Sequence, residues 1–297
     1  VQQAEALTMI VDFLFLRKQE TLFLLTGFAG TGKSSMIGAL VKTMNDLKQK
    51  SVLLAPTGRA AKVFSLYSEH PAFTIHKKIY RQKAYTGDSA DFGIMDNLYK
   101  DTLFIVDEAS MISNDSFGSY SFGSGRLLDD LIKYVYSGEN CRLLLIGDSA
   151  QLPPVGLEDS PALSIGMLEG YGMEVYSTHL TEVVRQAESS GILFNATNIR
   201  NALRQNETEL YPKLKLDNFA DVKSISGEDL IDEMSSAYSR DGVDSTMVVT
   251  RSNKRANIYN QGVRNTILYR EDELSTGDLL MITKNNYFWT ENIKDIE

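Results

Sequence analysis

The 297-residue sequence predicts an α/β protein built on a parallel β-sheet. Apolar runs rich in β-branched and aromatic residues recur along the chain, and they are continuous rather than alternating, which is typical of parallel strands buried on both faces. Segments with helical periodicity lie between these runs, so that strand and helix alternate. The predicted strands are residues 21–26, 51–55, 102–107, 142–147 and 245–250.

The predicted helices follow in chain order. Residues 1–20 have the pattern of an amphipathic helix, and the apolar positions between Met36 and Leu47 predict a second helix directly after the first strand. Further helices are predicted over residues 125–136 and 192–203, and after the strand 245–250. The side chains expected to face inward from the first helix are Leu7, Ile10, Val11, Leu14 and Phe15.

Chain length and composition limit the organisation and the class of protein. A chain of 297 residues is long enough for about two domains, and a break is predicted in AESSG, residues 187–191, giving domains 1–188 and 189–297. No apolar run approaches the roughly 18 residues of a membrane span, so we expect no membrane partner. The single cysteine, Cys141, excludes an internal disulfide and, with no basic leader at the start, favours the cytoplasm.

The net charge of −9, from 30 basic and 39 acidic residues, argues against a general electrostatic grip on nucleic acid. It leaves room for a local groove. The segment KKIYRQKAY, residues 77–85, combines basic residues with tyrosines, and its composition fits either a solvated surface or a contact patch.

The segment GFAGTGKS, residues 27–34, matches the phosphate-loop motif G-x-x-x-x-G-K-[ST] between a predicted strand and a predicted helix. Its glycines let consecutive N–H groups point at phosphate oxygens, and the helix start adds partial positive charge. We expect Lys33 to hold the β- and γ-phosphates of ATP and Ser34 to ligate Mg²⁺. The sequence thus indicates a P-loop NTPase whose loop binds ATP through Gly27, Ala29, Gly30, Thr31, Gly32, Lys33, Ser34 and Ser35.

Adjacent carboxylates, Asp107 and Glu108, stand at the end of the apolar run in LFIVDEAS, residues 103–110. We expect Asp107 to meet the Mg²⁺ shell and Glu108 to orient or deprotonate the attacking water, which predicts hydrolysis of ATP. A kinase needs no such glutamate. The alternative is that the two acids cap the helix that follows.

The segment GDSAQLPPVG, residues 147–156, ends the predicted strand 142–147. In α/β proteins ligands sit at the carboxyl ends of parallel strands, so Gln151 is expected beside Asp107. Its amide can donate to a γ-phosphate and accept from water, and Pro153 and Pro154 stiffen the connection that follows. A plain turn is the alternative interpretation.

The ordered set GFAGTGKS, LLAPTGRAAK, TIH, VDEASM, GDSAQLPPVG and LTEVVRQ resembles superfamily 1 DNA helicases of the RecD-like group. The resemblance implies two RecA-like domains, each a parallel sheet with helices on both faces. It also implies ATP and Mg²⁺ in the cleft between them, single-stranded DNA across their tops and 5′ to 3′ translocation. DNA repair or recombination is the implied setting, with nuclease or repair-complex proteins as further partners.

The resemblance assigns roles to further positions. Gln3 corresponds to the family's adenine-reading glutamine, with Gln2 as the alternative, and Arg185 to the arginine that reaches the γ-phosphate, with a surface ion pair as the alternative. Residues 77–100 fall where the family inserts a small wedge element. The DNA-binding candidates are Pro56, Thr57, Arg59, Ala60, His76, Thr250, Arg251 and Asn253, with a helix N-cap as the alternative role of Thr57 and a structural role as that of His76.

Family members continue beyond the equivalent of GDLLMITKNNY, residues 277–287, into motifs that this sequence does not contain. We therefore expect an incomplete second RecA-like domain and weak activity of this chain alone. The predicted function is an ATP-dependent DNA helicase or translocase. The alternatives are an ATP-dependent nucleic-acid-binding switch and a small-molecule kinase, and the combination of Glu108 with Gln151 favours the motor.

Overall fold

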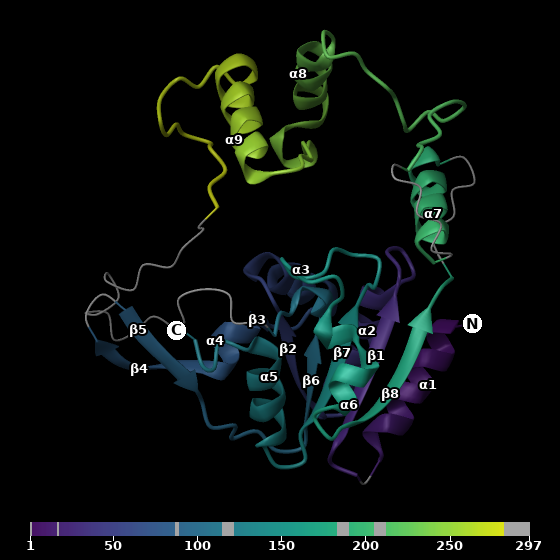
Figure 1. The fold of residues 1–297 in the computed structure, drawn as a ribbon, viewed down its shortest axis with the longest axis vertical. Coiled ribbons are helices and arrows are strands. Elements are labelled where there is room, and N and C mark those ends of the chain that lie inside the picture. The colour runs from purple at the N-terminus through teal and green to yellow at the C-terminus, as the bar shows by residue number, and fades with distance from the viewer. Residues whose placement is uncertain are drawn as a thin grey trace. The chain divides into compact units, whose positions relative to one another are not determined.

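The computed structural model describes two compact units (Figure 1). Unit 1 comprises residues 1–188 and 196–210, and unit 2 comprises residues 189–195 and 211–297. The described residues are 2–16, 18–86, 89–114, 122–182, 190–204 and 212–281, with the backbone alone described for 82–86, 89–91 and 203–204.

Unit 1 is built on a six-stranded sheet with the strand order β3-β2-β6-β7-β1-β8. Every neighbouring pair in this sheet is parallel, so the carboxyl ends of the strands share one edge. The predicted parallel sheet is therefore confirmed. The strands are β1 (Thr21–Gly27), β2 (Lys50–Ala55), β3 (Ala72–Thr74), β6 (Thr102–Val106), β7 (Arg142–Gly147) and β8 (Glu174–Leu180).

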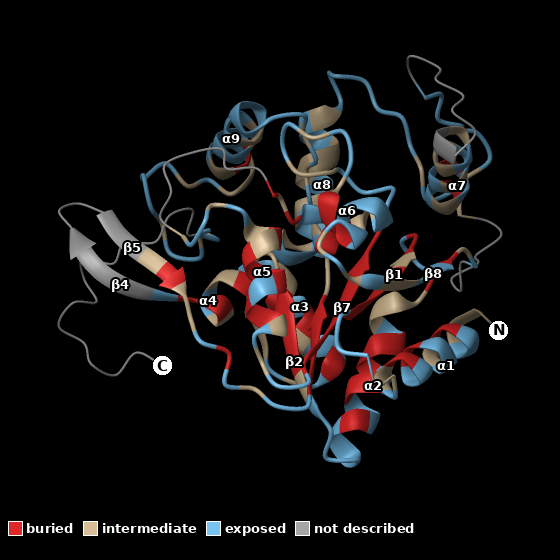
Figure 2. Cartoon of the chain, turned by 60° about the horizontal axis from the view of Figure 1, so that its bottom comes forward, coloured by how far each residue is buried: buried red, intermediate tan, exposed pale blue. Residues whose placement is uncertain are grey.

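Helices cover both faces of the sheet, as predicted. One face packs against α1 (Gln2–Leu14), α2 (Lys33–Asp46) and α3 (Gly58–Ser68). The other packs against α4 (Ile75–Ile79), α5 (Leu127–Tyr136) and α6 (Ile165–Glu169). Figure 2 shows the buried residues concentrated in the strands and on the inner sides of these helices. Each fully buried Leu, Ile or Phe contributes about 1.5–3 kcal/mol, so the two layers together hold the sheet.

The inward face of α1 differs from the prediction. Ile10 is fully buried, but Val11 is 41% exposed and Phe15, which lies beyond the end of the helix, is 82% exposed. Ala6 and Phe13 are buried instead, and the ring of Phe13 packs against that of Phe23 in β1. The helix ends before Phe15, so the 3.6-residue period that placed this side chain inward no longer applies to it.

An antiparallel hairpin, β4 (Tyr80–Thr86) and β5 (Ser89–Ile94), occupies the region of the predicted wedge element. Its base is tied to α5 by a buried hydrogen bond of 2.7 Å from the Tyr80 hydroxyl to the Asp130 carboxylate. Ser124 donates to the same carboxylate from its backbone N–H, at 2.9 Å, and from its hydroxyl, at 2.8 Å. Three donors therefore bind the carboxylate of Asp130 at the base of the hairpin.

Unit 2 contains α8 (Leu230–Asp241), α9 (Asn253–Gly262) and a π-helix (Val263–Ile267), and the division between the units falls within α7 (Gly191–Arg204). The predicted strand 245–250 is wrong: a short 3₁₀ helix (Val243–Ser245) ends there and residues 246–250 pair with no strand. Met247 and Val249 are exposed. The described part of unit 2 contains no strand with which residues 246–250 could pair, and an apolar run without a partner strand cannot form the hydrogen bonds of a sheet.

Two 3₁₀ turns (Ala109–Met111 and Pro161–Leu163) complete the elements of unit 1. In the described part of the chain, no helix is both long enough and apolar enough to cross a membrane.

Candidate functional site

The chain leaves each strand of the unit 1 sheet at the same carboxyl edge, because β3, β2, β6, β7, β1 and β8 are parallel neighbours. The phosphate loop follows β1, with β7 on one side of it and β8 on the other. Asp107 follows β6, and Asp148 follows β7. The order of the strands thus brings sequence-distant polar residues to one place (Figure 1).

The phosphate loop is held in a shape that depends on glycine. Gly30 and Gly32 have φ of 81° and 83°, in the left-handed region that favours glycine. At Gly27 a Cβ atom would lie 2.9 Å from the Cβ of Leu180 in β8, so only glycine fits there. The buried Thr31 hydroxyl donates to the Phe28 carbonyl at 2.8 Å, and α2 begins at Lys33. Ser34 and Ser35 therefore lie in the first turn of α2, where free N–H groups favour an anion.

The ammonium of Lys33 lies inside this loop. It donates to the carbonyl oxygens of Gly27, at 2.6 Å, and Phe28, at 2.9 Å. Burial lowers the pKa of Lys33, and the positive charge of Arg200 lowers it further, while the negative charges of Asp148, Asp107 and Glu108 act in the opposite direction. The lysine is therefore a partly desolvated cation at a place where three carboxylates and a guanidinium converge.

Asp107 and Glu108 sit where the chain leaves β6. The Asp107 N–H donates to the Leu54 carbonyl in β2, and the Asp107 carboxylate accepts from the Glu108 N–H at 2.9 Å. Burial raises the pKa of Asp107 to about 6, and the charge of Glu108 acts in the same direction. Glu108 has a φ of 55°, so its side chain departs from an uncommon left-handed backbone that redirects it after the strand.

Gln151 lies beside this pair. Its side-chain carbonyl accepts a hydrogen bond of 3.0 Å from the Ser110 hydroxyl, two residues beyond Glu108. A hollow of about 280 Å³ opens next to it, lined in part by Ser110, Asp148 and Gln151. Gln151 is thus bound to the turn that follows β6, at a residue three positions beyond Asp107.

Asp148 was not predicted as a site residue. It is buried, its carboxylate accepts from the Ala150 N–H at 2.9 Å, and its charge is the strongest of those that favour the charged form of Lys33. The sequence carried the signal, because Asp148 directly follows an apolar strand, as Asp107 does.

The two candidate adenine-reading glutamines have different partners. Gln3 donates to the Thr31 carbonyl at 2.8 Å, and so ties α1 to the phosphate loop. Gln2 donates to the Thr181 hydroxyl at 2.9 Å and accepts from the backbone N–H groups of Thr181 and Glu182. Gln3 is therefore the one that lies on the phosphate loop.

The DNA-binding candidates fall in both units. Thr57 caps α3 by accepting from the Ala60 N–H at 3.2 Å, with Pro56 before it and Arg59 exposed on the first turn. Thr250, Arg251 and Asn253 belong to unit 2, around the N-terminus of α9. Arg185 lies outside the described residues.

His76 has a packed environment. Its ring stands 5.2 Å from the Phe122 ring, edge to face, and 5.7 Å from that of Tyr80, and burial lowers its pKa. His76 thus packs against aromatic rings at the base of the hairpin, which fits the structural role left open for it.

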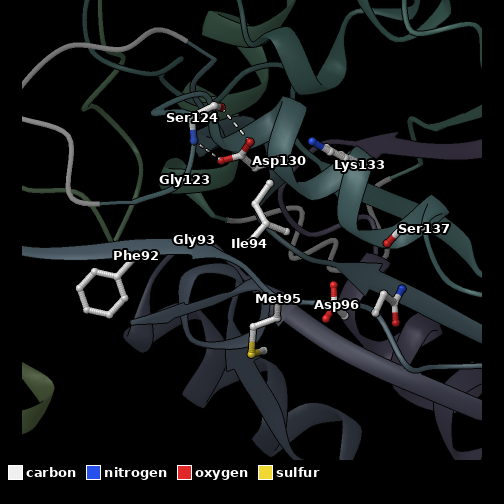
Figure 3. Close-up of a pocket in the computed structure, with 11 residues that line it drawn as sticks. Phe92, Gly93, Ile94, Met95, Asp96, Gly123, Ser124, Asp130, Lys133 and Ser137 are labelled. Atoms are coloured by element: carbon white, nitrogen blue, oxygen red, sulfur yellow. Dashed lines mark hydrogen bonds between the residues drawn. The ribbon is translucent and has the colours of Figure 1, made fainter. Parts of the chain in front are cut away.

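Figure 3 shows a second hollow, of about 640 Å³, between β5 and α5. Lys133 and Asp96 line it, and Asp130 points toward Ser124 rather than into open space. Because the Asp130 carboxylate already accepts three hydrogen bonds, it serves to anchor the hairpin.

The chain matches a protein-family model and is similar to known proteins and structures. Residues 2–227 match the family model described as AAA domain. The chain is 31% identical to the ATP-dependent RecD2 DNA helicase of Deinococcus radiodurans over 175 residues, which are 58% of this chain and 21% of that protein. It is 32% identical to the ATP-dependent DNA helicase Pif1 of Bdellovibrio bacteriovorus over 155 residues, which are 52% of this chain and 32% of that protein.

Among solved structures, the Pif1 helicase from Candida albicans is similar with a TM-score of 0.51 and 18% identity, covering 90% of this chain and 54% of that chain. At this identity the likeness shows the fold alone. The matched stretches are 21% and 32% of the lengths of the two curated relatives. The predicted resemblance to superfamily 1 helicases is confirmed, as a distant similarity to RecD2 and Pif1.

Proposed function

Because this chain belongs to the AAA domain family, we propose that it hydrolyses ATP as part of a 5′ to 3′ DNA helicase or translocase. The observation that carries the proposal is the convergence of Lys33, Asp107, Glu108 and Gln151 from the ends of three neighbouring strands. A nucleotide-binding module that does not hydrolyse ATP has no use for the glutamate and the glutamine together.

Lys33 and the phosphate loop bind the polyphosphate in this proposal. The Lys33 ammonium now donates to two carbonyls of its own loop, and phosphate oxygens offer it stronger, charged acceptors at the same place. The first-turn N–H groups of α2 supply neutral donors beside it. Gln3, on the Thr31 carbonyl, is the proposed adenine-reading residue because that contact places it next to the loop.

The donor set suits Mg²⁺. Ser34 offers a hydroxyl and Asp107 a carboxylate, both hard oxygen donors, and Mg²⁺ sites on nucleotides need few protein ligands because phosphates and water supply the others. The metal, when bound, neutralises charge on the phosphates. A metal ligand role needs the charged form of Asp107, and the charge of Lys33 favours that form.

Glu108 acts on the attacking water, and Gln151 acts on the terminal phosphate. Glu108 accepts or orients the proton of the water, and Gln151, with its carbonyl held by Ser110, turns its N–H₂ toward the terminal phosphate. Arg185 is proposed as a further cation at that phosphate on the basis of its motif alone.

DNA is the proposed second ligand, since the two relatives from Deinococcus radiodurans and Bdellovibrio bacteriovorus are described as ATP-dependent DNA helicases. In unit 1 the proposed contacts are Pro56, Thr57, Arg59 and Ala60 at the N-terminus of α3, of which Arg59 is exposed, and His76 beside the hairpin. The hairpin β4-β5 is proposed as the strand-separating wedge, and its buried anchor at Asp130 supports a load-carrying role. In unit 2 the proposed contacts are Thr250, Arg251 and Asn253.

The domain assignment is part of the same proposal. We assign residues 1–188 to the first RecA-like domain and residues 189–297 to part of a second. The division of the chain into compact units at Glu188 supports the boundary, except that residues 196–210, which include Arg200, belong to unit 1. The RecA-like nature of the second part is inferred from the motif around α9 rather than from any strand.

The test is the rate of ATP hydrolysis with and without single-stranded oligo-dT, with Lys33→Ala as the blank. We expect stimulation by oligo-dT that disappears in Lys33→Ala. Glu108→Gln should keep nucleotide binding and lose about 10²-fold or more in rate, since general-base catalysis contributes that much. If the chain binds nucleotide but its rate of ATP hydrolysis does not change with DNA, the helicase proposal is contradicted and a nucleic-acid-binding switch is favoured.

A further inference from the structure

A guanidinium from α7 reaches the phosphate loop. The central carbon of the Arg200 guanidinium lies 4.4 Å from the centre of the Phe28 ring, and both residues belong to unit 1. Phe28 is the second residue of the phosphate loop and only 5% exposed. Arg200 is itself half-buried, so the contact is partly shielded from water, where a cation–π interaction is strongest.

The aromatic platform under Arg200 is fixed from its other neighbours. The His179 ring meets Phe28 edge to face with ring centres 5.1 Å apart. His179 in turn lies 2.9 Å from the Thr26 hydroxyl through its Nδ1 atom, which holds its ring against β1. Phe28 therefore cannot move away without disturbing β1 and β8, so the ring beneath the guanidinium is held in place.

Arg200 and Lys33 flank the same residue. The Lys33 ammonium donates to the Phe28 carbonyl at 2.9 Å, while the Arg200 guanidinium stands over the Phe28 ring. The two cations are close enough that the charge of Arg200 lowers the pKa of Lys33. Like charges held this close repel each other, and an anion between them removes that repulsion.

The donors of Arg200 are not used within the described part of the chain. No described carboxylate forms an ion pair with it and no described acceptor takes a hydrogen bond from it, so its contact there is the Phe28 ring. A guanidinium has five N–H donors in a planar fork that matches phosphate oxygens. With its central carbon over the ring, the guanidinium keeps these donors available for an anion.

We propose that Arg200 is a phosphate-binding residue that contacts the β,γ end of a nucleoside triphosphate together with Lys33. Arg200 lies over the ring of Phe28, and the Lys33 ammonium binds the carbonyl of the same residue. Because the motif lysine holds the β- and γ-phosphates, this end of the nucleotide is the one that Arg200 would contact. The inference rests on the proposed ATP function. It adds a cation that neither the phosphate-loop motif nor the motif of Arg185 indicated.

The test measures dissociation constants for AMP-PNP, ADP and AMP by isothermal titration calorimetry, using the whole chain. We expect Arg200→Ala to raise the dissociation constant of AMP-PNP about tenfold, which corresponds to about 1.4 kcal/mol of binding free energy. The dissociation constant of ADP should rise less, and that of AMP should not change. Arg200→Lys keeps the charge without the planar fork and should recover part of the loss. Arg126→Ala is the matched control, because it removes a surface guanidinium that pairs with Asp129.

The pattern across the three nucleotides separates phosphate binding from packing. An equal rise in the dissociation constants of all three nucleotides, or an unchanged dissociation constant for AMP-PNP, would overturn the role of Arg200. If Arg200→Ala does not fold, the same comparison is made with Arg200→Lys, whose dissociation constant for AMP-PNP should rise more than its dissociation constant for AMP. Failure of the unmodified chain to bind any nucleotide, or binding that survives Lys33→Ala, would instead contradict the proposed function.

Discussion

Removal of one hydroxyl at the base of the hairpin tests the anchor of β4-β5. The Tyr80 hydroxyl donates to the buried Asp130 carboxylate at 2.7 Å, and only Ser124 supplies its other two donors. Burial raises the pKa of Tyr80, and the bond to Asp130 raises it further, so the phenol stays a donor at neutral pH. Tyr80→Phe deletes this single donor and keeps the ring that packs against Phe122.

The magnitude follows from the charge on the acceptor. A hydrogen bond to a charged group contributes about 1.5–3 kcal/mol, and Asp130 is 3% exposed, so water cannot replace the lost donor. We expect Tyr80→Phe to cost about 2 kcal/mol. Tyr136→Phe is a matched control, because its hydroxyl donates at the same distance, 2.7 Å, to the neutral carbonyl of Thr21, where the loss is about 1 kcal/mol.

Hydrogen exchange by mass spectrometry measures both changes, since exchange in buried strands reports the opening free energy. Peptides from β6 and β7 should exchange about thirtyfold faster in Tyr80→Phe and about fivefold faster in Tyr136→Phe, from the same free energies. Hairpin peptides should respond to Tyr80→Phe more than to Tyr136→Phe. An effect of Tyr80→Phe no larger than that of the control would refute the charged anchor.

Three further predictions concern the loop, the glutamine and unit 2. Gly32→Ala should lower stability by about 1–2 kcal/mol in thermal unfolding, because φ is 83° and its Cβ would lie 2.2 Å from Nε2 of Gln3; unchanged stability would contradict this. Ser110→Ala should slow ATP hydrolysis about fivefold at unchanged nucleotide affinity, since it frees the Gln151 amide, and an unchanged rate would show that this bond does not orient it. The pKa of Asp278 is lowered from 3.8 to about 2 by donors that bind its charged form, so its contribution to unit 2 should be complete above pH 3.8 and disappear as pH falls toward 2. Unfolding of unit 2 followed against pH in Asp278→Asn should lack this dependence, and a persisting one would assign it to another group.

Several strands were predictable because their neighbours bury them on both sides. The runs 21–26, 51–55, 102–107 and 142–147 correspond to β1, β2, β6 and β7, the four central strands of the sheet. The edge strands β3 and β8 were not predicted. β3 has three residues, and β8 is only partly buried, so neither shows the continuous apolar run that marks a central strand.

The sheet order also explains what the sequence could not indicate about the site. Gly27 in the phosphate loop pairs with Leu180 of β8, so Leu180 lies next to the loop although about 150 residues separate the two in the chain. Asp148 and Arg200 reach Lys33 by the same kind of long-range placement. No local pattern around either residue specifies which strand or loop it will meet.

The sequence by itself determined the phosphate loop, the Asp107–Glu108 pair and the position of Gln151 at the end of a strand. Each depends on a few consecutive residues, because glycine torsions, a helix start and a strand end are local properties of the backbone. Tertiary structure alone decided that 245–250 would remain unpaired, that Tyr80 would meet Asp130, and that Arg200 would stack on Phe28. These outcomes depend on which distant segments become neighbours, and that is settled by burying two apolar faces of one sheet rather than by local preference.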